Sequence, residues 1–466
     1  RSIKGVSMNI KNTLLAFAVV SLTHNIYAEI DTAPSVEIKV TQEEKNDTAA
    51  HNFPIVSQRG GQSLEERRNH YLNNKGMSLG NDIKGNYIGW GEEAISTSPK
   101  SIDFAQKRVM AFEKAFVDAK AKFVRMKKQE TASSISREIF EDDRDRNIVE
   151  IKDGVIVSLA KKIHALTEAA IDEKLIEYGV DPGTVANSNI NKKRKLVENS
   201  INKQIAIKAV ENISGIRVVA TFEGPNGVED GIGVGVLIKA TPKYRDIARA
   251  IASKKLVGYP TKIDPKDSIR QQLNSRLNND DYFLQHGLRI MTDDSGNRVL
   301  VSFGQWSPKV TRNDSRLRIN TAIKSAKGIA YDHALSYIIM FVNTTLALEN
   351  KTKLSDSETI NILSHTDGAT EKQQNSSVGA MLEKFVKETS RVSIEGVSEV
   401  HSWATNHPET GHLLVGSVLM WSPTTQAYSR AYNKKFIPKQ ETKKPKFQQY
   451  NSNQGSYKTY RSKDFD

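Results

Sequence analysis

Two stretches of the chain decide its fold: 213-ISGIRVVATFEGPNGVEDGIGVGVLIKATPKYRDIARA-250 and 394-IEGVSEVHSWATNHPETGHLLVGSVLMWSPTTQAYSRA-431. They align without a gap at an offset of 181 residues and share eight identities, among them Gly215 with Gly396. Each stretch has two apolar runs separated by a polar turn with glycine, proline or asparagine, a pattern that predicts a β-hairpin. Repetition of the pattern indicates a duplicated module.

A helix is predicted to follow each hairpin. Thr241 and Ser422 are good N-cap residues, because their side-chain oxygens accept a hydrogen bond from a backbone N–H of the first turn. Pro242 and Pro423 come next, at the first helical position, where the missing N–H of proline has no cost. Both copies therefore end in the same kind of strand-to-helix junction.

A second match lies upstream of each hairpin, at an offset of 215 residues. It aligns Gly89 with Gly304, and Ala111, Ala115 and Ala119 with Ala326, Ala330 and Ala334. Alanines spaced by four residues lie on one face of a helix, and their small side chains allow a sheet to approach closely. The two offsets differ by 34 residues, so the first copy has an insertion within 140–199. In it we expect an amphipathic helix with Leu159, Ile163, Leu166 and Ala170 on one stripe.

These patterns predict an α+β protein made of two tandem copies of a helix/β-hairpin/long helix/helix/β-hairpin module. Residues 62–255 form the first module, with its helical insertion, and residues 263–432 form the second. The leading helix of the first module starts at Ser63, which forms a capping box with Glu66. Residues 29–61 are polar and are interpreted as an extended linker.

Residues 1–28 are interpreted as upstream residues followed by a secretory signal peptide. Met8 precedes a polar, basic segment, the apolar run TLLAFAVVSL follows at 13–22, and Ile26-Tyr27-Ala28 fits a cleavage site. The apolar run is too short to span a bilayer, so no transmembrane segment is expected after cleavage. The chain has no cysteine, which excludes disulfides, a thiolate nucleophile and a lipid-anchoring cysteine. We expect a periplasmic protein of a Gram-negative bacterium.

Residues 433–466 are predicted to form a basic, disordered tail. The chain has a formal charge of +13, and this segment contains nine Lys and Arg against three acidic residues. Its low hydrophobicity is typical of segments that do not fold alone. Six lysines are candidates for binding an anionic partner such as cell-wall polymer, lipid headgroups or nucleic acid: Lys434, Lys435, Lys439, Lys443, Lys444 and Lys446. The alternative is a tail that only keeps the protein soluble.

The best candidates for metal ligands are His401, His407, Glu409 and His412, because imidazole and carboxylate groups suit zinc. Their spacing differs from the helical HExxH pattern, and the equivalent turn of the first copy has no histidine. The segment Gly231–Gly235 lacks the lysine of a phosphate-binding loop, which favours a closely packed strand over a nucleotide site. We therefore assign no catalytic residue, metal or cofactor.

The four tryptophans, Trp90, Trp306, Trp403 and Trp421, all fall in or beside predicted hairpin strands. Large aromatic side chains contribute strongly to a core, and this is the first interpretation. The alternative is an exposed aromatic face that stacks on sugar rings or on a partner protein.

The glycine, alanine and aromatic spacing of these modules resembles the periplasmic α/β modules of Gram-negative outer-membrane lipoproteins and flagellar ring proteins. The resemblance implies a structural or assembly role and no catalytic residues. We accordingly expect a non-enzymatic protein that binds an envelope partner or assembles with itself. Two alternatives stay open: a factor that binds cell wall or nucleic acid through the basic tail, and a hydrolase without a local signature.

Overall fold

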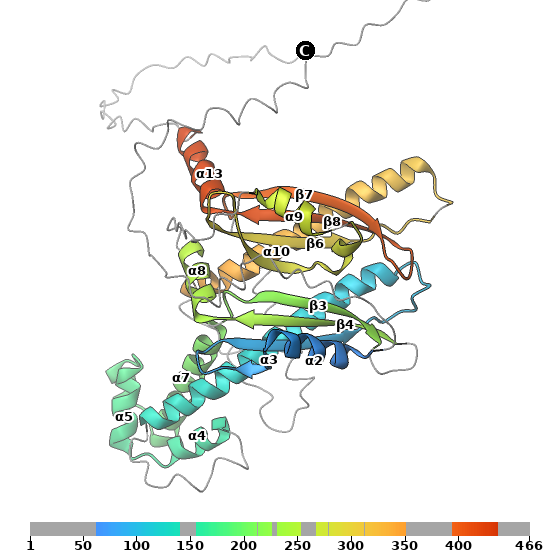
Figure 1. The fold of residues 1–466 in the computed structure, drawn as a ribbon. Coiled ribbons are helices and arrows are strands. Elements are labelled where there is room, and N and C mark those ends of the chain that lie inside the picture. Colours follow the sequence, from blue (N-terminus) through green and yellow to red (C-terminus); the bar gives the residue numbers. More distant parts are fainter. Residues whose placement is uncertain are drawn as a thin grey trace, which may run out of the picture.

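Two four-stranded antiparallel sheets form the centre of the molecule (Figure 1). The computed structural model describes residues 62–139, 155–211, 213–225, 231–252, 267–277, 279–311, 313–350 and 394–436. Each sheet belongs to one of the two modules, which confirms the α+β class and agrees with tandem copies. The segments predicted to be a signal peptide and a linker, residues 1–28 and 29–61, lie outside the described residues.

The two sheets have the same strand order. In the first sheet the order is β1 (Gly80–Asn81), β2 (Tyr87–Ala94), β4 (Ile232–Ala240) and β3 (Arg217–Pro225). In the second sheet it is β5 (Gly287–Thr292), β6 (Arg298–Trp306), β8 (Leu413–Trp421) and β7 (Val397–Asn406). The C-terminal hairpin of each module therefore pairs through its second strand with an earlier strand of the same module.

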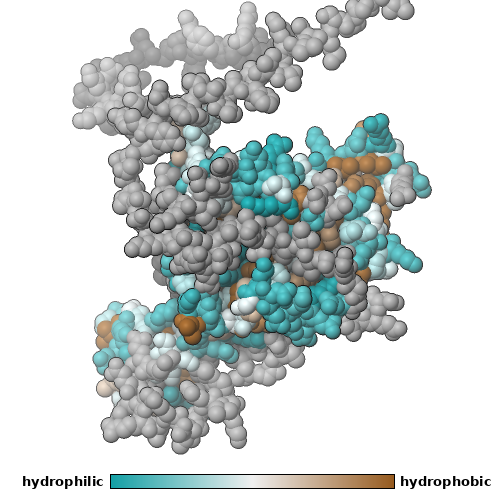
Figure 2. Space-filling view, in the orientation of Figure 1, coloured by the Kyte–Doolittle hydropathy of each residue, from teal (hydrophilic) through white to brown (hydrophobic). Residues whose placement is uncertain are grey.

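Helices cover both faces of each sheet. The long helices α3 (Phe104–Ile139) and α10 (Arg316–Asn350) pack on one face, and the short helices α2 (Leu64–Lys75) and α9 (Ile269–Arg276) pack on the other. Each short helix begins with a capping box, at Ser63 and at Ser268. Helices α8 (Pro242–Ala252) and α13 (Pro423–Phe436) close the modules. The visible face over α2 and α9 is largely hydrophilic (Figure 2).

The closing hairpins are equivalent in detail. Both first strands have a β-bulge at the same aligned position, Val219 in β3 and Val400 in β7. Gly215 and Gly396 precede these strands with φ of 79° and 86°, and a Cβ at either would clash with the backbone of the helix that follows the hairpin. The N-caps are also as predicted, because Tyr244 N donates to Thr241 Oγ1 and Thr425 N donates to Ser422 Oγ, both at 3.0 Å.

The upstream match needs one correction. Gly91, and not Gly89, is the structural equivalent of Gly304: each pairs with an aligned residue of the closing hairpin, Val236 or Ser417. A Cβ on Gly91 would clash with the Ala115 carbonyl, and one on Gly304 would clash with the Ala330 carbonyl. The alanine match holds, because Ala115 and Ala330 occupy equivalent places, but the glycine match was wrong by two residues, because the connection between strand and helix differs in length.

The insertion in the first module forms a helical lobe. Besides the ends of α3 and α7 (Ile190–Glu211), the lobe contains α4 (Val155–His164), α5 (Glu168–Glu177) and α6 (Pro182–Ala186). Its core is separate from that of the sheets and includes Leu159, Ile163 and Ile171. The single helix predicted for the stripe from Leu159 to Ala170 was wrong, because Thr167 starts a new helix by accepting a hydrogen bond from Ala170 N.

Within the described residues, no helix is both long and apolar enough to cross a membrane.

Candidate functional site

The two modules meet along a seam, where the edge strand β3 of the first sheet lies beside the edge strand β5 of the second. Arg289 Nη1 on β5 donates to Val218 O on β3 at 3.1 Å. Gly215 N donates to Phe341 O of α10 at 3.0 Å. One hydrophobic core runs across the seam, since Phe112 and Phe116 of α3 make edge contacts with Tyr337 of α10. The modules are thus fused and not merely linked.

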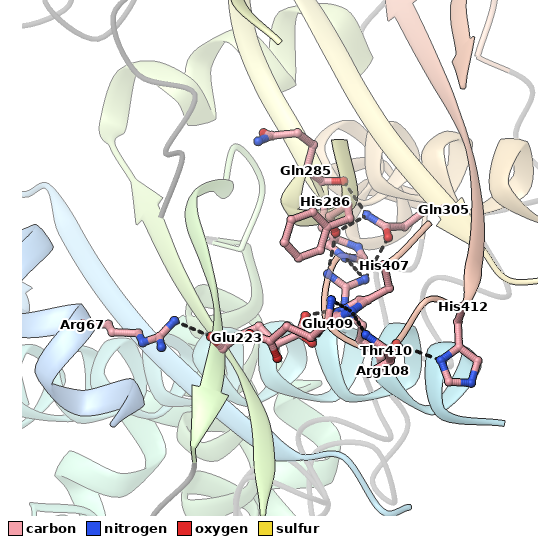
Figure 3. Close-up of polar contacts among 11 residues, drawn as sticks. Arg67, Arg108, Glu223, Gln285, His286, Gln305, His407, Glu409, Thr410 and His412 are labelled. Atoms are coloured by element: carbon pink, nitrogen blue, oxygen red, sulfur yellow. Dashed lines mark hydrogen bonds and ion pairs between the residues drawn. The ribbon is translucent and has the colours of Figure 1, made fainter. Parts of the chain in front are cut away.

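A buried ionic network lies in this seam (Figure 3). Its centre is Arg108 on α3, which is 1 % exposed. The Arg108 guanidinium is ion-paired through Nε with Glu223 of β3. Its Nη1 donates to Gln305 Oε1 at 2.9 Å, and its Nη2 donates to Phe283 O. One side chain therefore connects the first module to two elements of the second.

Glu223 is the anion of the network. Its Oε2 accepts from Arg108, and its Oε1 lies 2.9 Å from His407 Nε2. Burial by itself raises the pKa of Glu223, but the charge of Arg108 and the hydrogen bond from His407 outweigh burial and lower the pKa to about 2. Glu223 is therefore ionised at any physiological pH, and its charge is matched by Arg108.

His407 comes from the turn between β7 and β8, and its surroundings determine its tautomer. Glu409 N and Thr410 N each point at His407 Nδ1 at 3.3 Å, so this nitrogen is an acceptor and has no proton. The proton is then on Nε2, which donates to Glu223. The ring contacts Phe104 and Phe283 edge-on. His407 thus joins the last hairpin of the second module to β3 of the first.

This network connects the two modules and does not expose a reactive group. A histidine beside a carboxylate can act as a general base, but only if one ring nitrogen reaches a substrate. Both nitrogens of His407 are engaged within the protein, and the side chain is buried. Each guanidinium nitrogen of Arg108 also has an acceptor. The arrangement is suited to a rigid joint, because buried ion pairs stabilise only when all their polar groups are satisfied.

The four metal-ligand candidates do not converge. His407 bonds Glu223, and His412 Nε2 donates to Ser101 O at 2.8 Å. The His401 ring stacks on Tyr282 with centroids 5.2 Å apart, and Glu409 is exposed. In the described ranges no three His, Cys, Asp or Glu side chains are grouped so as to hold a metal ion. The candidate ligands lie close together in the sequence, but their side chains point to different neighbours.

The tryptophans belong mostly to the core. Trp90, Trp403 and Trp421 are buried, which rules out stacking on a sugar for these three, and Trp306 is half-buried. Gly235 lies in β4 directly beneath the Trp90 ring, so this glycine serves close packing as predicted.

Four of the six candidate tail lysines lie beyond the described residues. Helix α13 continues to Phe436, so Lys434 and Lys435 belong to a helix, and the predicted start of the tail at 433 was wrong. The positions of Lys439, Lys443, Lys444 and Lys446 are outside the described part of the chain.

Sequence reasoning missed the network itself. Glu223 does give a signal, since it is a single acid in an apolar strand, and Arg108 is a cation in the apolar face of a helix. Their partnership has no local signal, because 115 residues separate them.

Comparison with known proteins gives no information on function. Residues 156–253, which include most of the lobe and the first closing hairpin, match the model of a family described as a domain of unknown function, DUF6844. A crystal structure of a hypothetical protein from Francisella tularensis is similar, with a TM-score of 0.49 and 16 % sequence identity over 82 % of this chain and 99 % of that chain. No curated protein matches.

Proposed function

We propose that the protein is a non-enzymatic scaffold of a periplasmic cell-envelope assembly, which presents its two modules as one rigid body to a partner protein or to further copies of itself. The observation that carries this proposal is the seam. The modules share a hydrophobic core and the ionic network of Arg108, Glu223 and His407. Large, apolar interfaces between domains oppose relative motion. A fixed geometry is useful for assembly, whereas hinged modules are typical of enzymes that close on a substrate.

The periplasmic location is supported by the leader-like pattern of residues 13–28 and by the absence of cysteine from the sequence. The scaffold role is supported further by the saturated hydrogen bonding of the network, which leaves no group of it for chemistry. The hydrophilic face over α2 and α9 is of the kind that binds reversibly through polar contacts (Figure 2).

The test combines export with assembly. The full chain is expressed in a Gram-negative host, released by osmotic shock and sequenced from its N-terminus, where Glu29 is expected first. Chemical cross-linking before release should trap complexes larger than the 52.0 kDa chain. Protein that stays in the cytoplasm with an intact N-terminus, or that is never cross-linked to a protein, contradicts the proposal.

A variant in the seam tests whether rigidity of the joint between the modules is needed for assembly, apart from the chemistry of the surface. Glu223→Ala breaks the buried network without changing the exposed surface, and it should reduce the yield of cross-linked complex while export continues. Glu93→Ala removes one partner of an exposed ion pair with Lys114 and is the matched control. Equal yields from the two variants would show that rigidity of the seam has no part in assembly.

A further inference from the structure

A second arginine of the seam, Arg289 on β5, is also buried but has no carboxylate partner among the described residues. Its side chain is 5 % exposed. Nη1 donates to the carbonyl oxygens of Val218 and His286, at 3.1 and 3.0 Å. Nε and Nη2 are both buried, and neither makes a hydrogen bond within the described residues. No ion pair joins Arg289 to an acidic side chain in that same part of the chain.

The two unsatisfied nitrogens form a chemically specific pair. Nε and Nη2 lie on one edge of the guanidinium, and this edge is a fork that donates two parallel hydrogen bonds to the oxygens of a carboxylate or phosphate. A buried donor without an acceptor destabilises the folded protein. Proteins rarely leave both prongs of such a fork unused, so the fork indicates an acceptor that is not among the described residues.

His286 adds a further donor to the same part of the seam. It is 1 % exposed, and its ring stacks on Phe112 with centroids 4.1 Å apart. Its Nε2 lies 3.5 Å from Nη1 of Arg108, which is always a donor, so His286 Nε2 is the acceptor and the proton is on Nδ1. His286 Nδ1 is buried and has no partner among the described residues. The backbone of His286 also binds Arg289 directly.

Burial and neighbouring cations lower the pKa values of both Arg289 and His286. Burial, followed by the charge of Arg217, lowers the pKa of Arg289 to about 9, while Tyr71 opposes them. Arg289 is therefore protonated at neutral pH. Burial, followed by the charges of Arg108 and Arg289, lowers the pKa of His286 well below its usual value, so this ring is neutral. The acid of the seam, Glu223, is already shared by Arg108 and His407.

We propose that the Nε/Nη2 fork of Arg289, assisted by the Nδ1–H of His286, binds a small oxyanion in the seam between the two modules. The ligand is of the size of phosphate or a short carboxylate, since the donors are buried and a polymer cannot reach them. This site goes beyond the scaffold role, because it couples the stability of the docked modules to the concentration of a ligand. The anion supplies for Arg289 the negative charge that Glu223 supplies for Arg108.

The first test is thermal unfolding of the full chain in inorganic phosphate or acetate, with ionic strength matched by sodium chloride. A ligand that binds only the folded state raises Tm progressively with its concentration. We expect phosphate or acetate to raise Tm at millimolar concentrations, and the preferred anion identifies a tetrahedral or a planar ligand. Isothermal titration should give a matching saturable heat. Identical Tm values in all three salts, with no heat of binding, would overturn the proposal.

Substitutions at Arg289 provide the specific readout. Arg289→Met removes an uncompensated buried charge, so it should equal or exceed the wild type in Tm without oxyanion, and it should not respond to phosphate or acetate. Arg289→Lys retains the charge but lacks the fork, and it should bind about tenfold more weakly or worse. Arg318→Met is the control, because Arg318 is an exposed partner of Asp314, and it should respond like the wild type.

The same variants can also rule out the proposed site. An oxyanion response that persists in Arg289→Met and Arg289→Lys would place the anion elsewhere on this basic chain. If Arg289→Met does not fold, the Arg289→Lys variant and the titration of the wild-type chain still decide the question.

Discussion

At the scale of single residues, the stability of the seam depends on matching buried charges. Arg108 and Glu223 are each nearly inaccessible to water, and their charges compensate each other. Removing one partner of such a pair leaves an unpaired buried charge, which is more costly than removing both. The network therefore stabilises the joint only as a complete unit, and this makes its energetics measurable by a double-mutant cycle.

Glu223→Ala is expected to lower the free energy of unfolding by about 3–5 kcal/mol, and Arg108→Met by a similar amount. The double variant Arg108→Met/Glu223→Ala should lose clearly less than the sum of the two. Urea denaturation of the four proteins gives the coupling free energy. Glu93→Ala, in an exposed pair with Lys114, should change stability by at most about 1 kcal/mol. Strictly additive losses would show that Arg108 and Glu223 act independently.

Lys120 on α3 is the opposite case, a buried cation that has no carboxylate partner within the described ranges. Its Nζ lies 3.8 Å from Met340 Sδ and 4.2 Å from the centre of the Phe116 ring. Burial lowers the pKa of Lys120 to about 7 from 10.5. Between these pH values the unfolded chain binds more protons than the folded chain, so the free energy of unfolding rises with pH in this window. Below pH 7 both states are protonated and the full cost of burying the charge is present.

Lys120→Met should consequently stabilise the protein at pH 6 to 7 by roughly 1–4 kcal/mol. The variant should also lose the rise in stability of the wild type between pH 7 and 10. Urea unfolding across this pH range measures both effects. Lys114→Met, on the same helix but with a side chain 66 % exposed, is the matched control. A less stable Lys120→Met would mean that the ammonium has a favourable partner.

At the scale of elements, each module is built on the close approach of a long helix to a strand. Gly91 of β2 and Gly304 of β6 lie directly against the backbones of α3 and α10, with the alanine ridges above them. The alanines alone do not specify this contact; the glycine on the facing strand is equally necessary. The two modules solve the same packing problem in the same way.

Gly91→Ala and Gly304→Ala should each destabilise the protein by about 1–3 kcal/mol, because a methyl group would overlap a helix carbonyl. Gly328→Ala provides the contrast within α10. Gly328 is exposed, no atom lies within 4 Å of a Cβ placed there, and alanine in a helix interior should stabilise by about 0.5–1 kcal/mol. Thermal unfolding of the three variants measures the effects. Equal effects at Gly304 and Gly328 would contradict the close approach.

At the scale of the whole molecule, the folded unit and the basic tail are expected to act separately. Helix α13 ends at Phe436, so the informative truncation removes residues 437–466 and not 433–466. The truncated protein should retain the Tm of the full chain. It should sediment less with cell-wall sacculi at low salt, because binding through lysines requires unscreened charge. A large fall in Tm would show that the segment packs on the folded unit.

Charge and chain length are separated by a variant in which Lys439, Lys443, Lys444 and Lys446 are changed to glutamine. It should sediment like the truncated protein if the lysines bind the polymer, with a salt dependence weaker than that of the full chain. Sedimentation equal to that of the full chain at every salt concentration would leave the tail with a solubilising role only.

The sequence by itself determined the elements and their repetition. The hairpins and the caps at Thr241 and Ser422 depend on residues close together in the chain, and such local patterns are readable because the same physics acts in short peptides. The position of Gly91 opposite Ala115 was missed by two residues, since a spacing rule has no information on the length of a loop.

The seam was decided only by the tertiary structure. Arg108 lies 115 residues from Glu223, and Glu223 lies 184 residues from His407, so no spacing in the sequence relates them. The histidines of the last turn were candidate metal ligands because the sequence gives the residue types but not the directions of the side chains. Arg108 meets a carboxylate, and Arg289 meets none among the described residues. This difference depends on how the two modules dock. Docking depends on the whole folded surface. Once a charge is buried, the presence or absence of a partner has a large effect on stability.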